Sequence, residues 1–276
     1  MSAMLDAPMI RIRNFQWGIT DAVDGREHAV PFIFGCLSKF QSEGIVPIVD
    51  TEAKSRVNAL ARNLLEASAP FVYLPKYSGI AYLHVWNKIE QDVFARRFKS
   101  LIEAAYDDFF VECSIEPISD YRSFITKLNS IEIFRDIKAV VYPPNPLFGR
   151  LWGSLRKYIE RRNADEVRVR ESTHKSPGLT TMVVDLMSNI LENPNFEPDS
   201  EPDITDAAVL MAADGYGKGQ IIGTGNGQEE IVVRTSDAHR SFLYSKEPLP
   251  EELAEHTDRQ LTGISNERDM KHPSDE

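Results

Sequence analysis

Apolar and polar residues alternate along several segments of the chain, and this pattern predicts strands. In MIRIRNFQWGI (9–19) apolar side chains alternate with arginines, as in a half-buried strand. VPFIFGCLSKF (30–40) is continuously apolar and fits either a strand or a short buried helix. FVYLPKY (71–77) and GIAYLHVWN (79–87) predict two strands joined at KYSG, which indicates a hairpin.

Two segments of the N-terminal part show the spacing of amphipathic helices instead. TEAKSRVNALARNLLEAS (51–68) has Thr51 as a possible cap and apolar residues three or four apart. EQDVFARRFKSLIEAAYDD (90–108) places Phe94 and Phe98 on one face. We therefore expect a helix over each of these two segments.

The middle third of the chain predicts strands and helices in the order β-α-β-α-β. The five segments are FFVECSIEP (109–117), SDYRSFITKLNSI (119–131) with Ser119 and Asp120 as caps, IFRDIKAVVYPPNP (133–146), LFGRLWGSLRKYIERRNA (147–164) and DEVRVRES (165–172). Such alternation implies helices packed on a sheet. The expected fold class is α+β with ferredoxin-like (split βαβ) units, and a small doubly wound sheet is the alternative.

The last third predicts a helix over 178–193, an acidic loop over 192–206 and an antiparallel β-meander over 206–237. From about Lys246 the chain is polar and acidic, which is typical of a disordered or loosely docked tail. The expected organisation is therefore an N-terminal α/β part over 1–106, a ferredoxin-like unit with the meander over 107–245, and a tail over 246–276.

Charge changes this picture only locally. The 276 residues have a formal net charge of −11, yet the segments 192–206 and 247–276 each carry −6, so the remainder is close to neutral. A basic surface on the folded body therefore remains possible. The chain has two cysteines, no apolar run long enough to span a membrane and no signal-peptide pattern at its start. We expect a cytoplasmic protein with no membrane contact and no cofactor.

A glycine-rich stretch, DGYGKGQIIGTGNG (214–227), is the most conspicuous motif. Backbone N–H groups in such a loop can hold phosphate oxygens, and Lys218 adds a positive charge. The stretch matches neither a Walker A loop nor a dinucleotide-binding fingerprint. Hairpin turns at both ends of a short strand are the alternative explanation. The candidate ligands of phosphate are Gly215, Gly217, Lys218, Gly223 and Gly225.

The glycine spacing G-x-G-x5-G-x-G resembles the glycine-rich loop of the repeat-associated RNA-binding proteins of CRISPR systems. The resemblance covers some eleven residues and implies ferredoxin-like domains and RNA binding; some members of the group are endoribonucleases. No catalytic histidine of that group can be matched here. PPNP (143–146) before a helix, together with DGYG (214–217), resembles uncharacterised bacterial proteins carried by prophages and defence islands. That second resemblance implies an anti-phage or mobile-element role.

Basic residues concentrate between 150 and 175, where a predicted helix and strand follow one another. The candidate nucleic-acid-binding residues in this segment are Arg156, Lys157, Arg161, Arg162, Arg168 and Arg170. Such a cluster would bind phosphates without reading sequence. The alternative is a solvated helix face with ion pairs between residues four apart.

Catalytic candidates are few. Asp136 and Lys138 form a D-x-K triplet that could act in a nuclease, and His239 could serve as a general base in RNA cleavage. The histidines and cysteines do not have the spacing of a metal site. The favoured function is a nucleic-acid-binding protein, with RNA or another single strand as the ligand. A nuclease, or a non-catalytic subunit that binds other proteins in a larger complex, are the alternatives.

Overall fold

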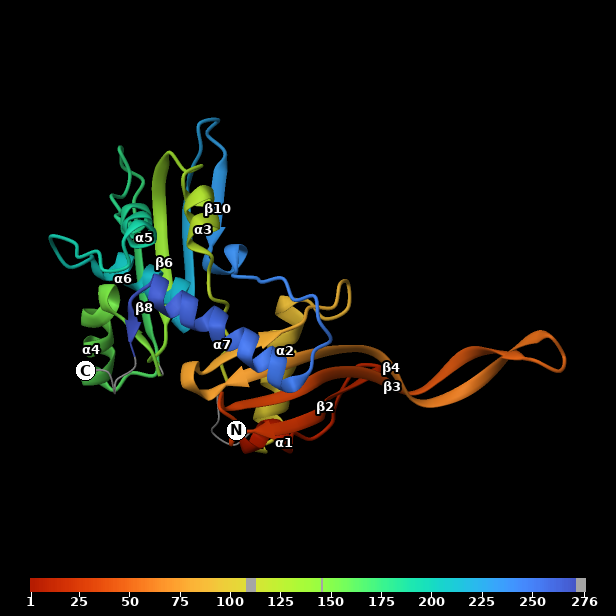
Figure 1. Ribbon diagram of the computed structural model, residues 1–276. Coiled ribbons are helices and arrows are strands. Elements are labelled where there is room, and N and C mark those ends of the chain that lie inside the picture. Colours follow the sequence, from red (N-terminus) through yellow and green to blue (C-terminus); the bar gives the residue numbers. More distant parts are fainter. Residues whose placement is uncertain (108–112, 145, 272–276) are drawn as a thin grey trace. The chain divides into compact units, whose positions relative to one another are not determined.

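The computed structural model of the chain describes residues 1–107, 113–144 and 146–271 (Figure 1). These residues form two compact units, each with helices and strands. Unit 1 contains residues 1–114 and 247–259, and unit 2 contains 115–246 and 260–276. The α+β class expected from the sequence is confirmed. No helix in the described part of the chain is both long and apolar enough to cross a membrane.

Unit 1 is built on an antiparallel five-stranded sheet in which strands adjacent in sequence are paired. Its strands are β1 (Ile10–Ile12), β2 (Phe15–Gly25), β3 (Phe32–Asp50), β4 (Ser55–Leu74) and β5 (Gly79–Tyr82). The helices are α1 (Ser2–Leu5) and α2 (Gln91–Ala104), and a 3-10 turn, η1 (Pro75–Tyr77), joins β4 to β5. Phe71 of β4 packs edge-on against Phe94 and Phe98 of α2, as the apolar spacing of that helix predicts.

The helix expected over 51–68 is wrong, because most of this segment belongs to β4. Its pairing with β3 runs from Asp50 opposite Ser55 to Ile33 opposite Tyr73. The strand period becomes visible only near its end, where Ala67, Ala69 and Phe71 are buried. Backbone pairing with a partner strand outweighed the local helical spacing. The apolar segment over 30–40, which the pattern left open, is part of β3.

Unit 2 contains an antiparallel four-stranded sheet in the order β10-β9-β6-β8. The strands are β6 (Ile133–Val141), β8 (Val167–Ser172), β9 (Gly217–Thr224) and β10 (Glu230–Arg234). The helices are α3 (Tyr121–Leu128), α4 (Gly153–Arg162), α5 (Val183–Glu192) and α6 (Ile204–Met211). Short turns complete it: η2 (Arg150–Trp152), the π-helical turn η3 (Ala212–Tyr216) and η4 (Thr235–Ala238).

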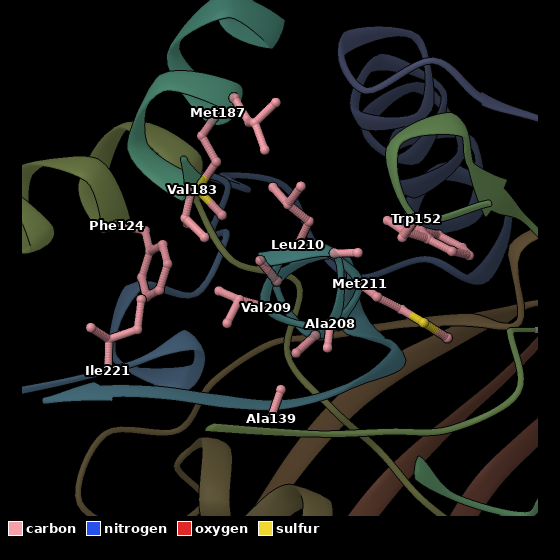
Figure 2. Close-up of a cluster of buried hydrophobic side chains, with 14 of the residues drawn as sticks. Phe124, Ala139, Trp152, Val183, Met187, Ala208, Val209, Leu210, Met211 and Ile221 are labelled. Carbon is pink, nitrogen blue, oxygen red and sulfur yellow. The ribbon is translucent and has the colours of Figure 1, made fainter. Parts of the chain in front are cut away.

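The core of unit 2 lies between the helices and one face of this sheet. Figure 2 shows α6 residues such as Val209 above Ala139 of β6 and Ile221 of β9, with Phe124 of α3 beside them. The first strand of the expected meander is wrong, since this segment forms helix α6. All residues of α6 after Ile204 are buried. A segment that is enclosed on all sides needs no polar face, so its apolar run could not distinguish a helix from a strand. Only the β9–β10 hairpin of the meander is present.

The ferredoxin-like arrangement is not confirmed. The β6–α4–β8 segment contains an antiparallel strand pair, whereas a split βαβ unit requires parallel strands. The strand expected over 109–117 lies partly outside the described residues, and Cys113–Pro117 are in neither a helix nor a strand. Asp120 does cap α3 as expected, since its Oδ1 accepts from the Ser123 N–H at 2.9 Å.

In the segment expected to be a disordered or loosely docked tail, the described residues 246–271 contain regular secondary structure. It contains the 18-residue helix α7 (Pro250–Glu267), followed by β11 (Met270–Lys271), which pairs with β7 (Phe148–Gly149). Leu253 and Ile264 are buried, and so is Arg268 beyond the helix. Apolar residues three or four apart recur here among many acids, and the acidic composition concealed them.

Candidate functional site

The sheet of unit 2 has one face against the core and one open face, because side chains alternate along each strand. In β6, Ile137 and Ala139 are buried in the core, while Lys138 between them is exposed. In β8, Val167 and Val169 pack against the core, as the sequence predicts, and Arg168 and Arg170 project from the other face. Alternation thus places the strand arginines and Lys138 on the same open face.

Strand register aligns these side chains in a row. Arg234 of β10 is paired with Gln220 of β9, Gln220 with Lys138 of β6, and Lys138 with Arg170 of β8. Neighbouring strands lie about 4.8 Å apart, so the row extends about 14 Å across the sheet. In the adjacent row, Lys218 is paired with Val140 and Val140 with Arg168. We call the first set, Arg234, Gln220, Lys138 and Arg170, the basic row, and the second set the adjacent row.

A pocket of about 450 Å³ opens over the two rows. Its charged lining residues are Lys138, Arg168, Arg170, Lys218, Arg234 and the single acid Glu116. Val140, which lies in the adjacent row, contributes apolar surface between them. The lining therefore carries five positive charges against one negative charge. A pocket of this volume is within the range of small-molecule sites.

Three of the five cations are already paired. Arg170 donates two hydrogen bonds to Asp136 Oδ2 at 2.6 and 2.8 Å. Arg168 lies 2.7 Å from Glu166, and the Lys218 ammonium lies 3.3 Å from Glu116. These pairs fix the long side chains at the rim of the pocket.

The other two cations have no such restraint. Within the described residues, neither Lys138 nor Arg234 forms an ion pair, although both are exposed. They lie on either side of Gln220 in the basic row. Their charge is consequently available to an anionic ligand without displacement of a carboxylate.

The D-x-K pair lies on the same face of the sheet, but its acid, Asp136, is already bound to Arg170. Asp136 is 8% exposed and its Oδ2 accepts both bonds from Arg170, while its Oδ1 is buried without a hydrogen-bond partner. Asp136 does not line the pocket, whereas Lys138 does. Among the residues described, no group of three or more histidine, cysteine or acidic side chains could hold a metal ion. The geometry gives Asp136 a positioning role toward Arg170.

His239 lies apart from the pocket lining. It is exposed, and its backbone bridges to Ser119. Its neighbour Arg240 is bound to Asp120 at 2.6 Å and to Glu267 at 2.9 Å, so this guanidinium is not placed to assist at the pocket. In the part of the chain that the structure describes, the His239 ring has no hydrogen bond or ion pair with a second acid, base or nucleophile.

The basic cluster expected between 150 and 175 is divided between two sides of unit 2. Leu155 and Ile159 of α4 are buried in the core, on the helix-covered side of the sheet. No residue of α4 lines the pocket. Of its basic residues, Arg156 lies over the Phe148 ring at 3.9 Å, and Lys157, Arg161 and Arg162 are exposed to solvent. Of the candidate residues of this cluster, Arg168 and Arg170 line the pocket.

The glycines of the GYGKGQIIGTG stretch have packing and turn roles. Gly215 has a φ of 95°, which favours glycine, at the end of η3. A Cβ on Gly217 would lie 2.2 Å from the Val140 carbonyl oxygen, and one on Gly223 would lie 2.5 Å from the Ile133 carbonyl oxygen. Gly225 lies in the β9–β10 turn, where its N–H donates to the Glu229 carbonyl at 3.0 Å. Lys218 is the candidate residue of this stretch that lines the pocket.

Arg234, Gln220 and Glu116 were missed by sequence reasoning. The alternation of EEIVVRTSD could have placed Arg234 on the open face of a strand, opposite to Val233. Nothing local indicates that Gln220 lies between Arg234 and Lys138, since that relation depends on strand pairing.

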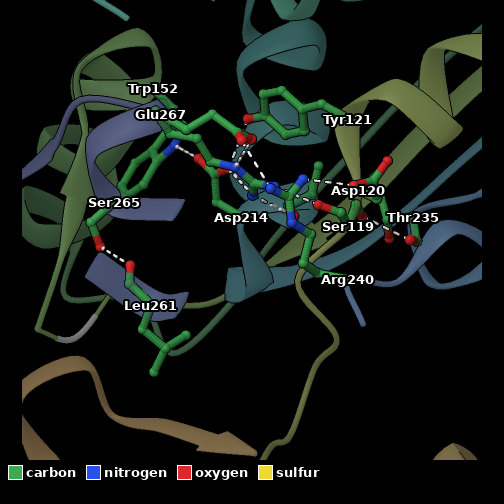
Figure 3. Close-up of polar contacts among 12 residues, drawn as sticks. Ser119, Asp120, Tyr121, Trp152, Asp214, Thr235, Arg240, Leu261, Ser265 and Glu267 are labelled. Carbon is green, nitrogen blue, oxygen red and sulfur yellow. Dashed lines mark hydrogen bonds and ion pairs between the residues drawn. The ribbon is translucent and has the colours of Figure 1, made fainter. Parts of the chain in front are cut away.

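A buried polar network fixes the wall of the pocket (Figure 3). Ser119 Oγ donates to the Thr235 carbonyl at 2.7 Å, and Thr235 Oγ1 accepts from the Gly219 N–H at 3.1 Å. Both Thr235 and Gly219 line the pocket. The Ser119 carbonyl in turn accepts a hydrogen bond from Arg268. The C-terminal Arg268 thereby supports the segment that carries Arg234.

Asp214 is the acceptor at the centre of this network. Its Oδ1 accepts from the Tyr121 hydroxyl at 2.7 Å and from Arg268 Nη1 at 2.8 Å, and its Oδ2 accepts from Trp152 Nε1 at 2.8 Å. Burial, together with the Asp214 carboxylate, raises the pKa of Tyr121 well above its usual range, so this phenol remains a donor. Three donors compensate the cost of burying one carboxylate.

Comparison with known proteins does not assign a function to this geometry. No protein-family model matches the chain, no curated protein is similar to it at a significant level, and no solved structure matches it either. The functional argument therefore depends on the pocket itself.

Proposed function

We propose that the protein binds nucleic acid, with single-stranded RNA as the preferred ligand, on the open face of the unit 2 sheet. The observation that carries the proposal is the basic row, in which Lys138 and Arg234 have exposed charges without ion pairs in the described chain. Lys138 is one strand from Arg170 and two strands, about 10 Å, from Arg234, so the row can contact more than one phosphate of an extended backbone.

The proposed preference for RNA and the proposed biological setting are supported by sequence resemblances. The glycine-rich stretch resembles the loop of CRISPR repeat-associated RNA-binding proteins, and its Lys218 lines the pocket. A role in a bacterial anti-phage or mobile-element system follows from the second resemblance, that of PPNP and DGYG. None of the described residues that line the pocket is aromatic. Binding therefore depends on phosphates and reads little base sequence.

Binding of a labelled single-stranded RNA, measured by fluorescence anisotropy between 50 and 200 mM salt, tests this proposal. For single strands the logarithm of the affinity falls with a slope of about 0.7 per phosphate contact against the logarithm of the salt concentration. The double variant Lys138→Glu, Arg234→Glu should bind at least about tenfold more weakly and with a shallower slope. Single-stranded DNA and duplex RNA serve as competitors that rank the ligands.

The matched control changes the same number of charges on the other side of unit 2. Arg161→Glu, Arg162→Glu alters two exposed residues of α4, which contributes nothing to the pocket lining. We expect this variant to bind like the wild type. Equal losses in the two double variants would mean that only net charge matters, and an unaffected pocket variant would reject the site. RNA cleavage in the same samples would favour the nuclease alternative.

A further inference from the structure

Strands β3 and β4 continue beyond the rest of the unit 1 sheet as a two-stranded ribbon (Figure 1). Pairing between β2 and β3 ends at Phe40, and pairing between β4 and β5 begins at Phe71. Residues 41–64 therefore pair only with each other, and we call them the arm. Two-stranded ribbons are marginally stable in water unless another layer packs on them.

The arm exposes apolar side chains on both of its faces. On one face Ile45 lies opposite Leu60, with 67% and 65% of each exposed. On the other face Ile48 lies opposite Val57, and both are again exposed. Exposed apolar pairs on a ribbon that no other layer covers are suited to contact with a partner. The arm thus presents a surface that a partner would cover.

The charges of the arm indicate what kind of partner fits. The arm has three acids and three bases: Glu43, Asp50, Glu52, Lys54, Arg56 and Arg62. A neutral, apolar ribbon has no electrostatic attraction for a nucleic acid or an anionic membrane surface. Its chemistry instead fits an apolar protein surface of balanced charge.

One pair of charges makes the arm complementary to itself. Glu43 of β3 and Arg62 of β4 are directly opposite in the ladder and share a face with Ile45 and Leu60. Both are exposed, and neither forms an ion pair with any residue that the structure describes. If a second arm lies parallel on this face, related by a two-fold axis along the arm, β3 of each copy covers β4 of the other. Glu43 of each protomer then faces Arg62 of the other.

We propose that two copies of this chain associate through these arms, stacked in parallel over the face of Ile45 and Leu60. The interface is isologous: each apolar pair packs on the same pair of the other protomer, and the two Glu43–Arg62 contacts lie side by side next to it along the ladder. Stacking converts two marginal two-stranded ribbons into a two-layer structure with a dry centre. The proposal is independent of nucleic-acid binding by unit 2.

Sedimentation velocity over a range of protein concentrations tests the association. The wild type should form a dimer as its concentration rises. Ile45→Ser, Leu60→Ser should raise the dimer dissociation constant about a hundredfold or more, because each side chain contributes twice across the two-fold axis. Both residues are solvent-exposed, so circular dichroism should show an unchanged fold. The control Phe242→Ser, Leu243→Ser removes exposed apolar residues outside the arm and should leave the dimer intact.

Charge reversal tests the parallel arrangement separately. Glu43→Arg alone opposes two arginines at each contact, and Arg62→Glu alone opposes two glutamates, so each variant should dimerise weakly. An equimolar mixture of the two should form a heterodimer with both contacts restored. A wild type that is monomeric at all concentrations, a dimer that survives the serine changes, or a mixture that fails to associate would each overturn the proposal.

Discussion

Arg268 and Asp214 form a buried ion pair that joins the end of the chain to the turn before β9. Arg268 Nη1 lies 2.8 Å from Asp214 Oδ1, and the two side chains are 1% and 4% exposed. The guanidinium also lies 4.0 Å from the centre of the Tyr121 ring. A segment whose composition suggested disorder thus supplies a residue of a buried polar cluster in unit 2.

Loss of this guanidinium should be strongly destabilising. Arg268→Leu leaves the Asp214 carboxylate buried with two donors instead of three, and removal of one partner from a buried pair costs about 3–5 kcal/mol. Urea unfolding measures the change. Arg259→Leu, on the exposed part of α7, is the control and should alter the free energy of unfolding by less than about 0.5 kcal/mol. Equal effects of the two variants would show that the pair does not stabilise the fold.

Two tyrosines, Tyr121 of this cluster and Tyr82 of β5, predict a loss of stability at alkaline pH. Burial raises the pKa of Tyr121 well above 10, and burial also raises the pKa of Tyr82 to about 12. The unfolded chain releases these protons near pH 10 while the folded protein retains them, so stability is constant below that pH and falls above it. Urea unfolding from pH 8 to pH 11 should show the decline. Tyr121→Phe should make the decline shallower, and an unchanged pH profile would contradict the assignment.

Asp136 offers a test that separates binding from nuclease chemistry. Asp136→Asn removes the carboxylate that holds Arg170 and leaves the open face one charge more positive. RNA affinity should rise about fivefold, equivalent to the ~1 kcal/mol between two charges 4 Å apart in water. Anisotropy measures this increase, and a gel assay on the same RNA measures cleavage. Weaker binding, or cleavage that Asp136→Asn abolishes, would contradict a purely positioning role for Asp136.

Gly217 tests the packing role of the glycine-rich stretch. Gly217→Ala places a Cβ 2.2 Å from the Val140 carbonyl oxygen, and the strained strand pairing should lower the free energy of unfolding by about 2 kcal/mol or more. Gly263→Ala, in α7 with no atom within 4 Å of the added Cβ, should instead stabilise the protein by about 1 kcal/mol. Thermal unfolding compares the two. A stable Gly217→Ala variant with weakened RNA binding would support a phosphate cradle instead.

Local chemistry predicted the elements whose periodicity is strong. Helix α2 follows from the spacing of Phe94 and Phe98, and α3 follows from its Asp120 cap. The alternation of β8 placed Arg168 and Arg170 on the open side without knowledge of any partner strand. These features depend on residues within one or two turns of each other, so the sequence contains what determines them.

Other features could not be predicted because distant partners determine them. The segment 51–68 has helical spacing, yet it pairs with β3 along the arm. The basic α4 and β8 residues are close in sequence, but the sheet separates them onto two sides. The close packing of Gly217 against Val140 also depends on a strand that is distant in sequence.

The sequence by itself determined the α+β class, the strand alternation and the confinement of net negative charge to two segments of an otherwise nearly neutral chain. Only the tertiary structure decided that Lys138, Arg170, Gln220 and Arg234 form one row, because antiparallel pairing brings four separate strands into register. Hydrogen bonds between strands that are distant in sequence set this register, and no local pattern encodes them.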